Sequence, residues 1–88
     1  MTTDIMTDLI CTYLYNNRVY LDSDIDIVEH DRYLKYRSLF FDYCGHSVEI
    51  RIHNPSFIEV KTDGKFGCVC DCIKSVRSEI DRLSSFRY

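Results

Sequence analysis

Residues 47–53 alternate between apolar and polar side chains more cleanly than any other segment of this 88-residue chain. Val48, Ile50 and Ile52 occupy one parity, while the polar residues Glu49, Arg51 and His53 alternate with them. Successive side chains of a β-strand point to opposite faces, so this pattern predicts a strand with one buried face and one wet face. A sheet covered on one side is therefore the constraint that the rest of the chain has to satisfy.

Three further segments, 18–28, 33–43 and 57–62, are also predicted to be strands, because alternating, β-branched or aromatic residues dominate them. Turn signals separate the strands: Asp31-Arg32, Cys44-Gly45-His46 and Asn54-Pro55-Ser56. Asp63-Gly64 is a strong hairpin signal. It permits a short fifth strand over 65–70, or a loop that leads directly into the last helix, and the sequence leaves both open.

Two segments have helical periodicity. Residues 3–16 carry one apolar stripe, with Thr2 or Thr3 suited to cap the start. A narrow apolar seam runs through about 69–85, at Val69, Ile73, Val76, Ile80 and Leu83. Connections of two to four residues imply antiparallel neighbours. We therefore predict an α+β fold in the order α-β-β-β-β-α: an antiparallel four-stranded sheet, five-stranded with the extra strand, and both helices on one face.

The bulk properties fit one compact domain over residues 1–88. No apolar run approaches the roughly 20 residues that span a bilayer, and the acidic start does not resemble a signal peptide, so we expect a cytoplasmic protein without a membrane partner. The net charge of −3 is unevenly distributed. Residues 1–31 hold seven acidic residues against one basic residue, Arg18, whereas residues 32–88 carry a formal charge of +3. Direct nucleic-acid binding through the acidic third is disfavoured, because phosphates need cations.

The segment LDSDIDIVEHD, residues 21–31, contains five carboxylates. On a predicted strand over 18–28, Val19, Leu21, Ile25 and Ile27 would face the core. Asp22, Asp24 and Asp26 would then form an outward row at a spacing of about 6–7 Å, close to that of phosphates along a nucleic-acid strand. Glu29 and Asp31 follow the row, and Tyr20 and Tyr33 lie near it as anchors for a partner. The alternative is that these charges only protect an edge strand from aggregation.

Other chemistry fits this segment poorly. The spacing of the aspartates is like the opening of a calcium loop, but Ile27 stands where the loop needs glycine and Tyr33 where it needs glutamate. A catalytic pair of carboxylates needs two different environments, which one wet strand face does not provide. We therefore expect no catalytic residues and no cofactor.

Five cysteines without a signal peptide suggest reduced, mostly buried thiols. The alternative is a zinc site drawn from Cys44, His46, Cys68, Cys70 and Cys72, although the spacing departs from the usual zinc knuckle. We expect His30 and His53 to lie exposed at strand ends. Seven tyrosines and five phenylalanines are a heavy load, and rings on both parities of 33–43 predict that some remain exposed, as in protein interfaces.

These observations predict a small non-enzymatic binding protein that inhibits a nucleic-acid-handling partner, with the acidic strand acting as a nucleic-acid mimic in a basic groove. Small phage proteins that block host enzymes or immune nucleases, anti-CRISPR proteins among them, share this size and charge, an analogy without a shared motif. Two alternatives stay open. One is a self-associating module, such as a homodimer joined through the exposed sheet face or the last helix, and the other is the zinc-stabilised module.

Overall fold

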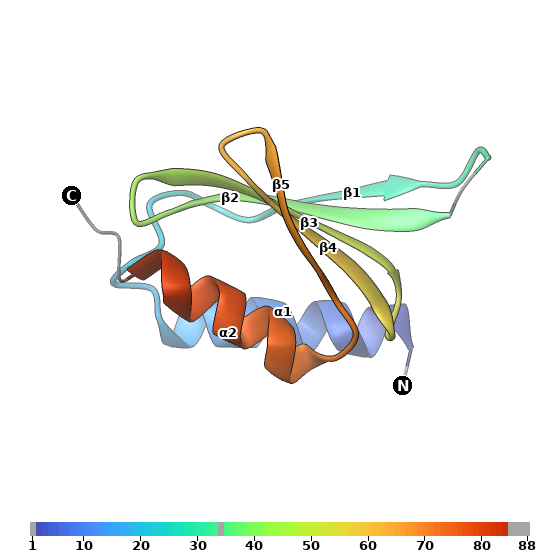
Figure 1. Cartoon of the computed structure of the whole chain (residues 1–88), viewed down its shortest axis with the longest axis horizontal. Helices are drawn as coiled ribbons and strands as arrows, with labels where there is room; N and C mark the ends of the chain where they lie inside the picture. Colours follow the sequence, from blue (N-terminus) through green and yellow to red (C-terminus); the bar gives the residue numbers. More distant parts are fainter. Residues whose placement is uncertain (1, 34, 85–88) are drawn as a thin grey trace.

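The computed structural model describes residues 2–33 and 35–84, and the predicted α+β fold is confirmed (Figure 1). All five strands are present, including the optional one. The elements in chain order are α1 (Thr3–Asn16), β1 (Asp26–His30), β2 (Tyr36–Tyr43), β3 (His46–Asn54), β4 (Phe57–Thr62), β5 (Lys65–Cys70) and α2 (Ile73–Ser84). Neither described helix is long and apolar enough to cross a membrane.

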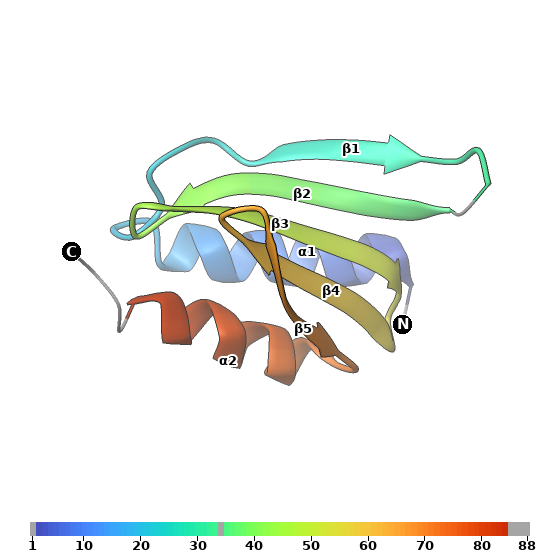
Figure 2. The ribbon, with the colours of Figure 1, turned by 45° about the horizontal axis from the view of Figure 1, so that its top comes forward.

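The strands form an antiparallel meander in the spatial order β1-β2-β3-β4-β5. Both helices lie side by side under the same face of this sheet (Figure 2). The main contacts of α1 are with β3 and α2, while α2 also contacts β4 and β5. The opposite face of the sheet has no layer over it among the described residues, and β1, at one edge of the sheet, has few contacts with either helix (Figure 2).

The core lies between the sheet and the helices, as the alternation predicts. Leu39, Ile50 and Ile58, from three adjacent strands, are completely buried. From the helix layer, Ile10 and Ile80 are completely buried as well. The apolar stripe of α2 is thus buried inside the domain, so two copies of the chain cannot associate through that stripe.

Two hairpins have turns of the same kind. Cys44 and Gly45 have φ values of 54° and 80°, and Asp63 and Gly64 have values of 54° and 78°. Two consecutive residues with positive φ make the type I′ geometry, whose twist matches that of the flanking strands. Both turns fall where the sequence predicted them.

The predicted strand over 18–28 is wrong over most of its length. Leu21 makes only an isolated bridge with Tyr43, and β1 begins at Asp26. Between them, the Ser23 hydroxyl accepts the backbone N–H of Asp42 at 2.8 Å. A side chain thereby takes a place that a ladder hydrogen bond would fill, a competition that serine and aspartate commonly offer. The predicted core parity holds only in part. Leu21 and Ile25 pack against the core, whereas Val19 is 71% exposed and Ile27 is 52% exposed.

The start of the last helix also differs from its prediction. The helix begins at Ile73, and Val69 lies in β5 with a 56% exposed side chain. The apolar seam from 69 to 83 therefore combines a strand residue with a helical stripe, because the hairpin at Asp63-Gly64 extends the sheet first.

We predict that Ile50→Ala lowers the free energy of unfolding by about 2–5 kcal/mol, because it opens a cavity in the closed core. Ile27→Ala, the same chemical change at a half-exposed position of β1, should cost less than about 1 kcal/mol. Urea unfolding of the two variants gives the comparison. Equal losses would contradict the placement of β1 beyond the helix layer.

Candidate functional site

The uncovered face of the sheet carries side chains that the core does not use. Those from β2 and β3 are polar or aromatic, and Phe40 is 38% exposed there, as the rings on both parities of that segment predicted. One end of this face is acidic, and the other end is a row of rings. We call these parts the acidic hollow and the aromatic row.

The acidic hollow is a depression of about 360 Å³ at the start of β1. Asp24, Asp26 and Asp42 contribute three exposed carboxylates, and Phe40 contributes an apolar surface among them. Register explains the grouping, because Asp26 is the direct partner of Phe40 and Asp42 is the partner of Ser47. None of the described residues that line the hollow is basic. The hollow therefore has the charge and the apolar surface to receive a Lys or Arg side chain.

The regular row of Asp22, Asp24 and Asp26 is not formed. Asp22 instead accepts the backbone N–H of Gly45 at 2.8 Å, which fixes it to the β2–β3 turn. Asp24 precedes β1, and only Asp26 lies on the strand. The predicted spacing of phosphate-like charges was therefore wrong, whereas Asp24 and Asp26 do share one site, which Asp42 completes.

The other predicted partner-binding residues are scattered. Glu29 lies on the helix-side face of β1, where it pairs with Arg37. Asp31 follows β1 and is exposed. Tyr33 is 98% exposed in the β1–β2 connection, but Tyr20 is half-buried and tilted against the ring of Tyr43. The structure does not gather these four residues with the acidic hollow.

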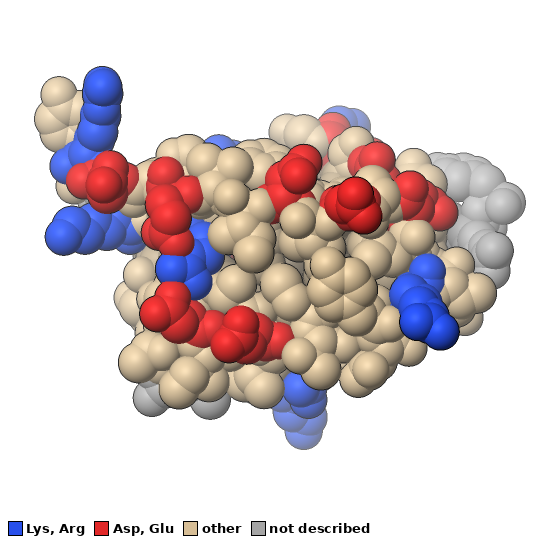
Figure 3. Space-filling model, turned by 180° about the vertical axis from the view of Figure 1, so that it is seen from behind, with Lys and Arg blue, Asp and Glu red and all other residues tan. Residues whose placement is uncertain are grey.

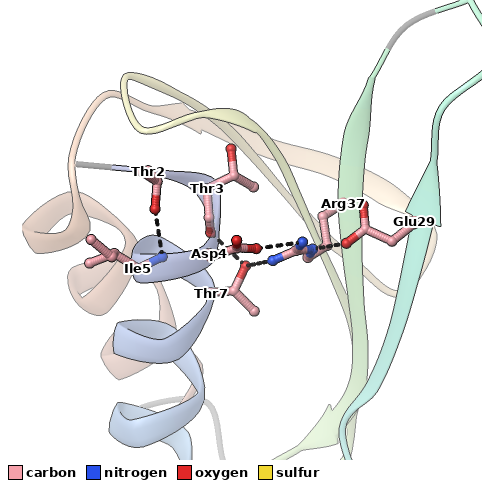
Figure 4. A network of polar contacts seen from close by, with 7 residues as sticks. All are labelled: Thr2, Thr3, Asp4, Ile5, Thr7, Glu29 and Arg37. Atoms are coloured by element: carbon pink, nitrogen blue, oxygen red, sulfur yellow. Dashed lines mark hydrogen bonds and ion pairs between the residues drawn. The ribbon is translucent and has the colours of Figure 1, made fainter.

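Arg37 offsets part of the acidic excess of the first third (Figure 4). From β2 its guanidinium pairs with Glu29 of β1 and with Asp4 of α1, the latter at 2.7 Å. It also donates to the Thr7 hydroxyl at 3.0 Å. The hydrogen bond with Asp4 and that with Glu29 both raise the pKa of Arg37. Even so, acidic side chains are spread from end to end over the side of the molecule that carries β1 and α1 (Figure 3).

The aromatic row crosses four strands at the other end of the uncovered face. His30 stacks on Tyr36 at a centroid distance of 4.2 Å, Tyr36 contacts His53 at 5.2 Å, and His53 stacks on Phe57 at 4.5 Å. The prediction that both histidines lie exposed was wrong, since both are half-buried. His53 also pairs with Glu59 at 2.6 Å, while Nε2 of His30 is enclosed without a hydrogen-bond partner among the described residues.

Between the two ends, an ion pair occupies the middle of the face. Arg51 pairs with Glu49 at 2.6 Å, and its guanidinium also lies over the ring of Tyr36 at 5.5 Å. Glu49 in turn accepts a hydrogen bond from the buried Ser38 at 3.3 Å. The shared parity of Tyr36 with Phe40 and Asp42 was visible in the sequence, but which strand lies next to which was not.

The zinc-ligand set of the sequence analysis is not assembled. No three His, Cys, Asp or Glu side chains within residues 2–33 and 35–84 are grouped as a metal ion would require. Cys44 lies at the β2–β3 turn, and His46 directs Nδ1 to Asp63 at 2.8 Å. Cys68 and Cys70 share the helix-side face of β5 with their sulfurs 3.5 Å apart, and Cys72 is exposed.

No family model, curated protein or solved structure matches this chain.

The cysteines should differ in reactivity. Burial, followed by the hydrogen bond with Cys70, raises the pKa of Cys68 to about 12, and burial also raises the pKa of Cys70. Thiolates are the reactive species, so iodoacetamide at about pH 8 should label the exposed Cys72 at least tenfold faster than Cys68. Peptide mass spectrometry reads the sites, and all five thiols should react in denaturant. Equal rates for Cys68 and Cys72 in the folded protein would contradict this placement.

The turn carboxylate Asp63 should make stability depend on pH. Hydrogen bonds from His46 and from the Ser47 backbone lower its pKa below the ordinary value of 3.8. A lowered pKa contributes stability that is present above 3.8 and is lost as the pH falls through the folded-state value. Asp63→Asn should therefore be less stable than the wild type at about pH 5–6, and the difference should shrink in acid. Asp31→Asn is the control, and a difference that persists to about pH 2 would contradict the assignment.

Proposed function

We propose that this chain is a non-enzymatic binding protein whose uncovered sheet face binds a basic surface of a protein partner. The acidic hollow carries the proposal, because three exposed carboxylates from two separate parts of the chain meet there around an apolar ring. A lysine or arginine side chain placed in it would gain charge contacts from Asp24, Asp26 and Asp42 and would pack its aliphatic stem on Phe40.

The aromatic row supplies a second contact of a different kind. Half-buried rings held by stacking lose little conformational entropy on binding, and aromatic side chains are enriched in protein interfaces. The face therefore offers an electrostatic contact at one end and an apolar anchor at the other. Arg51 and Glu49 form an ion pair between these two ends, so on this face the excess negative charge lies in the hollow.

We propose that the partner is a nucleic-acid-handling protein and that this chain inhibits it by competing for its basic groove. Small phage proteins that block host enzymes or immune nucleases, to which this chain is similar in size and charge, offer the analogy. Grooves that bind phosphates present the lysine and arginine side chains that the hollow would take. The cluster of carboxylates in the hollow, and not a regular phosphate-like spacing, supports this choice of partner. The three carboxylates share one solvent-exposed environment, which favours binding over acid–base catalysis, where the environments of paired carboxyl groups differ.

The test uses a fluorescent octa-arginine peptide as the basic probe. Wild-type protein should bind it at low salt, and Asp26→Asn/Asp42→Asn should weaken binding about tenfold, because each substitution removes one charge from the hollow. The wild type should also displace a labelled DNA duplex of about 20 base pairs from the same peptide, and the double variant should do so less well.

The matched control is Asp8→Asn/Asp71→Asn, which removes two exposed charges outside the hollow. It should change the dissociation constant by less than about twofold. If both double variants weaken binding equally, net charge alone is responsible and the hollow is not the site. Asp42→Asn keeps a side-chain oxygen that can accept the hydrogen bond from the Ser47 hydroxyl, so the fold should survive in the test variant.

A further inference from the structure

We infer that the free edge of β1 accepts an extended, basic segment of the partner as a sixth strand. This inference rests on the proposed function and specifies how the partner binds. β1 pairs only with β2, and no strand lies beyond it within the described part of the chain. Alternate N–H and C=O groups along its outer edge therefore point away from the sheet, which is the arrangement that strand addition uses.

The two edges of the sheet differ. The β4–β5 register shifts between Val60 and Lys61, opposite Gly67, and β5 also begins with Lys65. Bulges and lysines are common devices that protect an edge from pairing. The β1–β2 register, in contrast, runs without interruption from Asp26 to His30. Regular geometry makes β1 the better template of the two.

The side chains of β1 offer apolar area on both faces. Val28 on the uncovered face is 40% exposed, and Ile27 on the helix side is 52% exposed because the helices do not reach under it. An added strand would bury both residues through cross-strand pairs, which stabilise neighbouring strands. Neither residue belongs to the core.

Charge decides which occupant fits. Asp26 and Glu29 lie on β1, Asp24 and Asp31 flank it, and residues 19–31 contain no lysine or arginine. A second copy paired edge to edge would bring two such acidic segments together, which disfavours a homodimer at this edge. A basic segment would instead be attracted by these carboxylates.

The register fixes the preferred sequence of that segment. Residues opposite Glu29 and Asp26 should be basic, since Glu29 stays 61% exposed beside its partner Arg37, and the two residues between them, opposite Val28 and Ile27, should be apolar. The pattern is basic-apolar-apolar-basic, and it reads the same in parallel and antiparallel pairing. A peptide with this pattern tests the inference without knowledge of the natural partner.

The probe is a fluorescent peptide with the central sequence Thr-Lys-Val-Val-Lys-Thr. Two further versions are N-methylated on alternate residues, one on the odd and one on the even positions. Alternate N–H groups of a strand point to opposite sides, so one version should lose binding at least about tenfold while the other binds like the parent. Equal binding by both methylated versions would overturn strand addition while leaving charge-driven binding, and hence the proposed function, intact.

Matched variants of the protein locate the edge. Val28→Thr keeps the shape of an exposed valine on β1, and Val69→Thr makes the same change on β5, at the other edge of the uncovered face. We expect Val28→Thr to weaken peptide binding several-fold and Val69→Thr to leave it unchanged. Equal effects, or a concentration-dependent dimer in sedimentation that Val28→Thr abolishes, would overturn the inference. Failure of the peptide to bind while octa-arginine binds the hollow would overturn it as well.

Discussion

The structure depends on the burial of only one face of a five-stranded sheet. Two helices supply the covering layer, and their main contacts are with β3, β4 and β5. Burial of Leu39, Ile50 and Ile58 against that layer provides the main apolar stabilisation. The same arrangement leaves one sheet face and all of β1 outside the core. The binding surface that we propose is thus a direct consequence of how the core is covered.

Arg37 connects the edge strand β1 to the rest of the domain. Its guanidinium reaches from β2 to Asp4 of α1 and to Glu29 of β1, so one side chain joins three elements where apolar contact is sparse. It also divides the acidic residues into two groups. Asp4 and Glu29 pair with Arg37, although the Glu29 side chain stays 61% exposed, whereas Asp24, Asp26 and Asp42 surround the hollow, whose described lining has no basic residue. A charge count along the sequence cannot make this distinction, because Arg37 lies outside the acidic third.

The acidic segment shows how local competition limits prediction from a pattern. Alternation over 19–27 predicted one long strand, but the hydroxyl of Ser23 and the carboxylate of Asp22 bind backbone N–H groups of the β2–β3 hairpin. These bonds interrupt the hydrogen-bond ladder with β2, so β1 begins only at Asp26. The side chains capable of this were visible in the sequence, whereas the hairpin groups that they reach lie about twenty residues away. The aromatic row was missed for the same reason, because its rings come from four strands.

The sequence by itself determined both helices in outline, the central strands and the positions of the two turns at Gly45 and Gly64. These features depend on local periodicity and on residues such as Gly45 and Gly64 that suit a positive φ. Only the tertiary structure decided that β5 forms before α2, that Asp42 joins Asp24 and Asp26, and that the rings of His30 and His53 contact the ring of Tyr36. Each of these depends on strand order and register, which bring together residues far apart in the chain. Periodicity specifies which face a residue occupies, but packing alone specifies its neighbours.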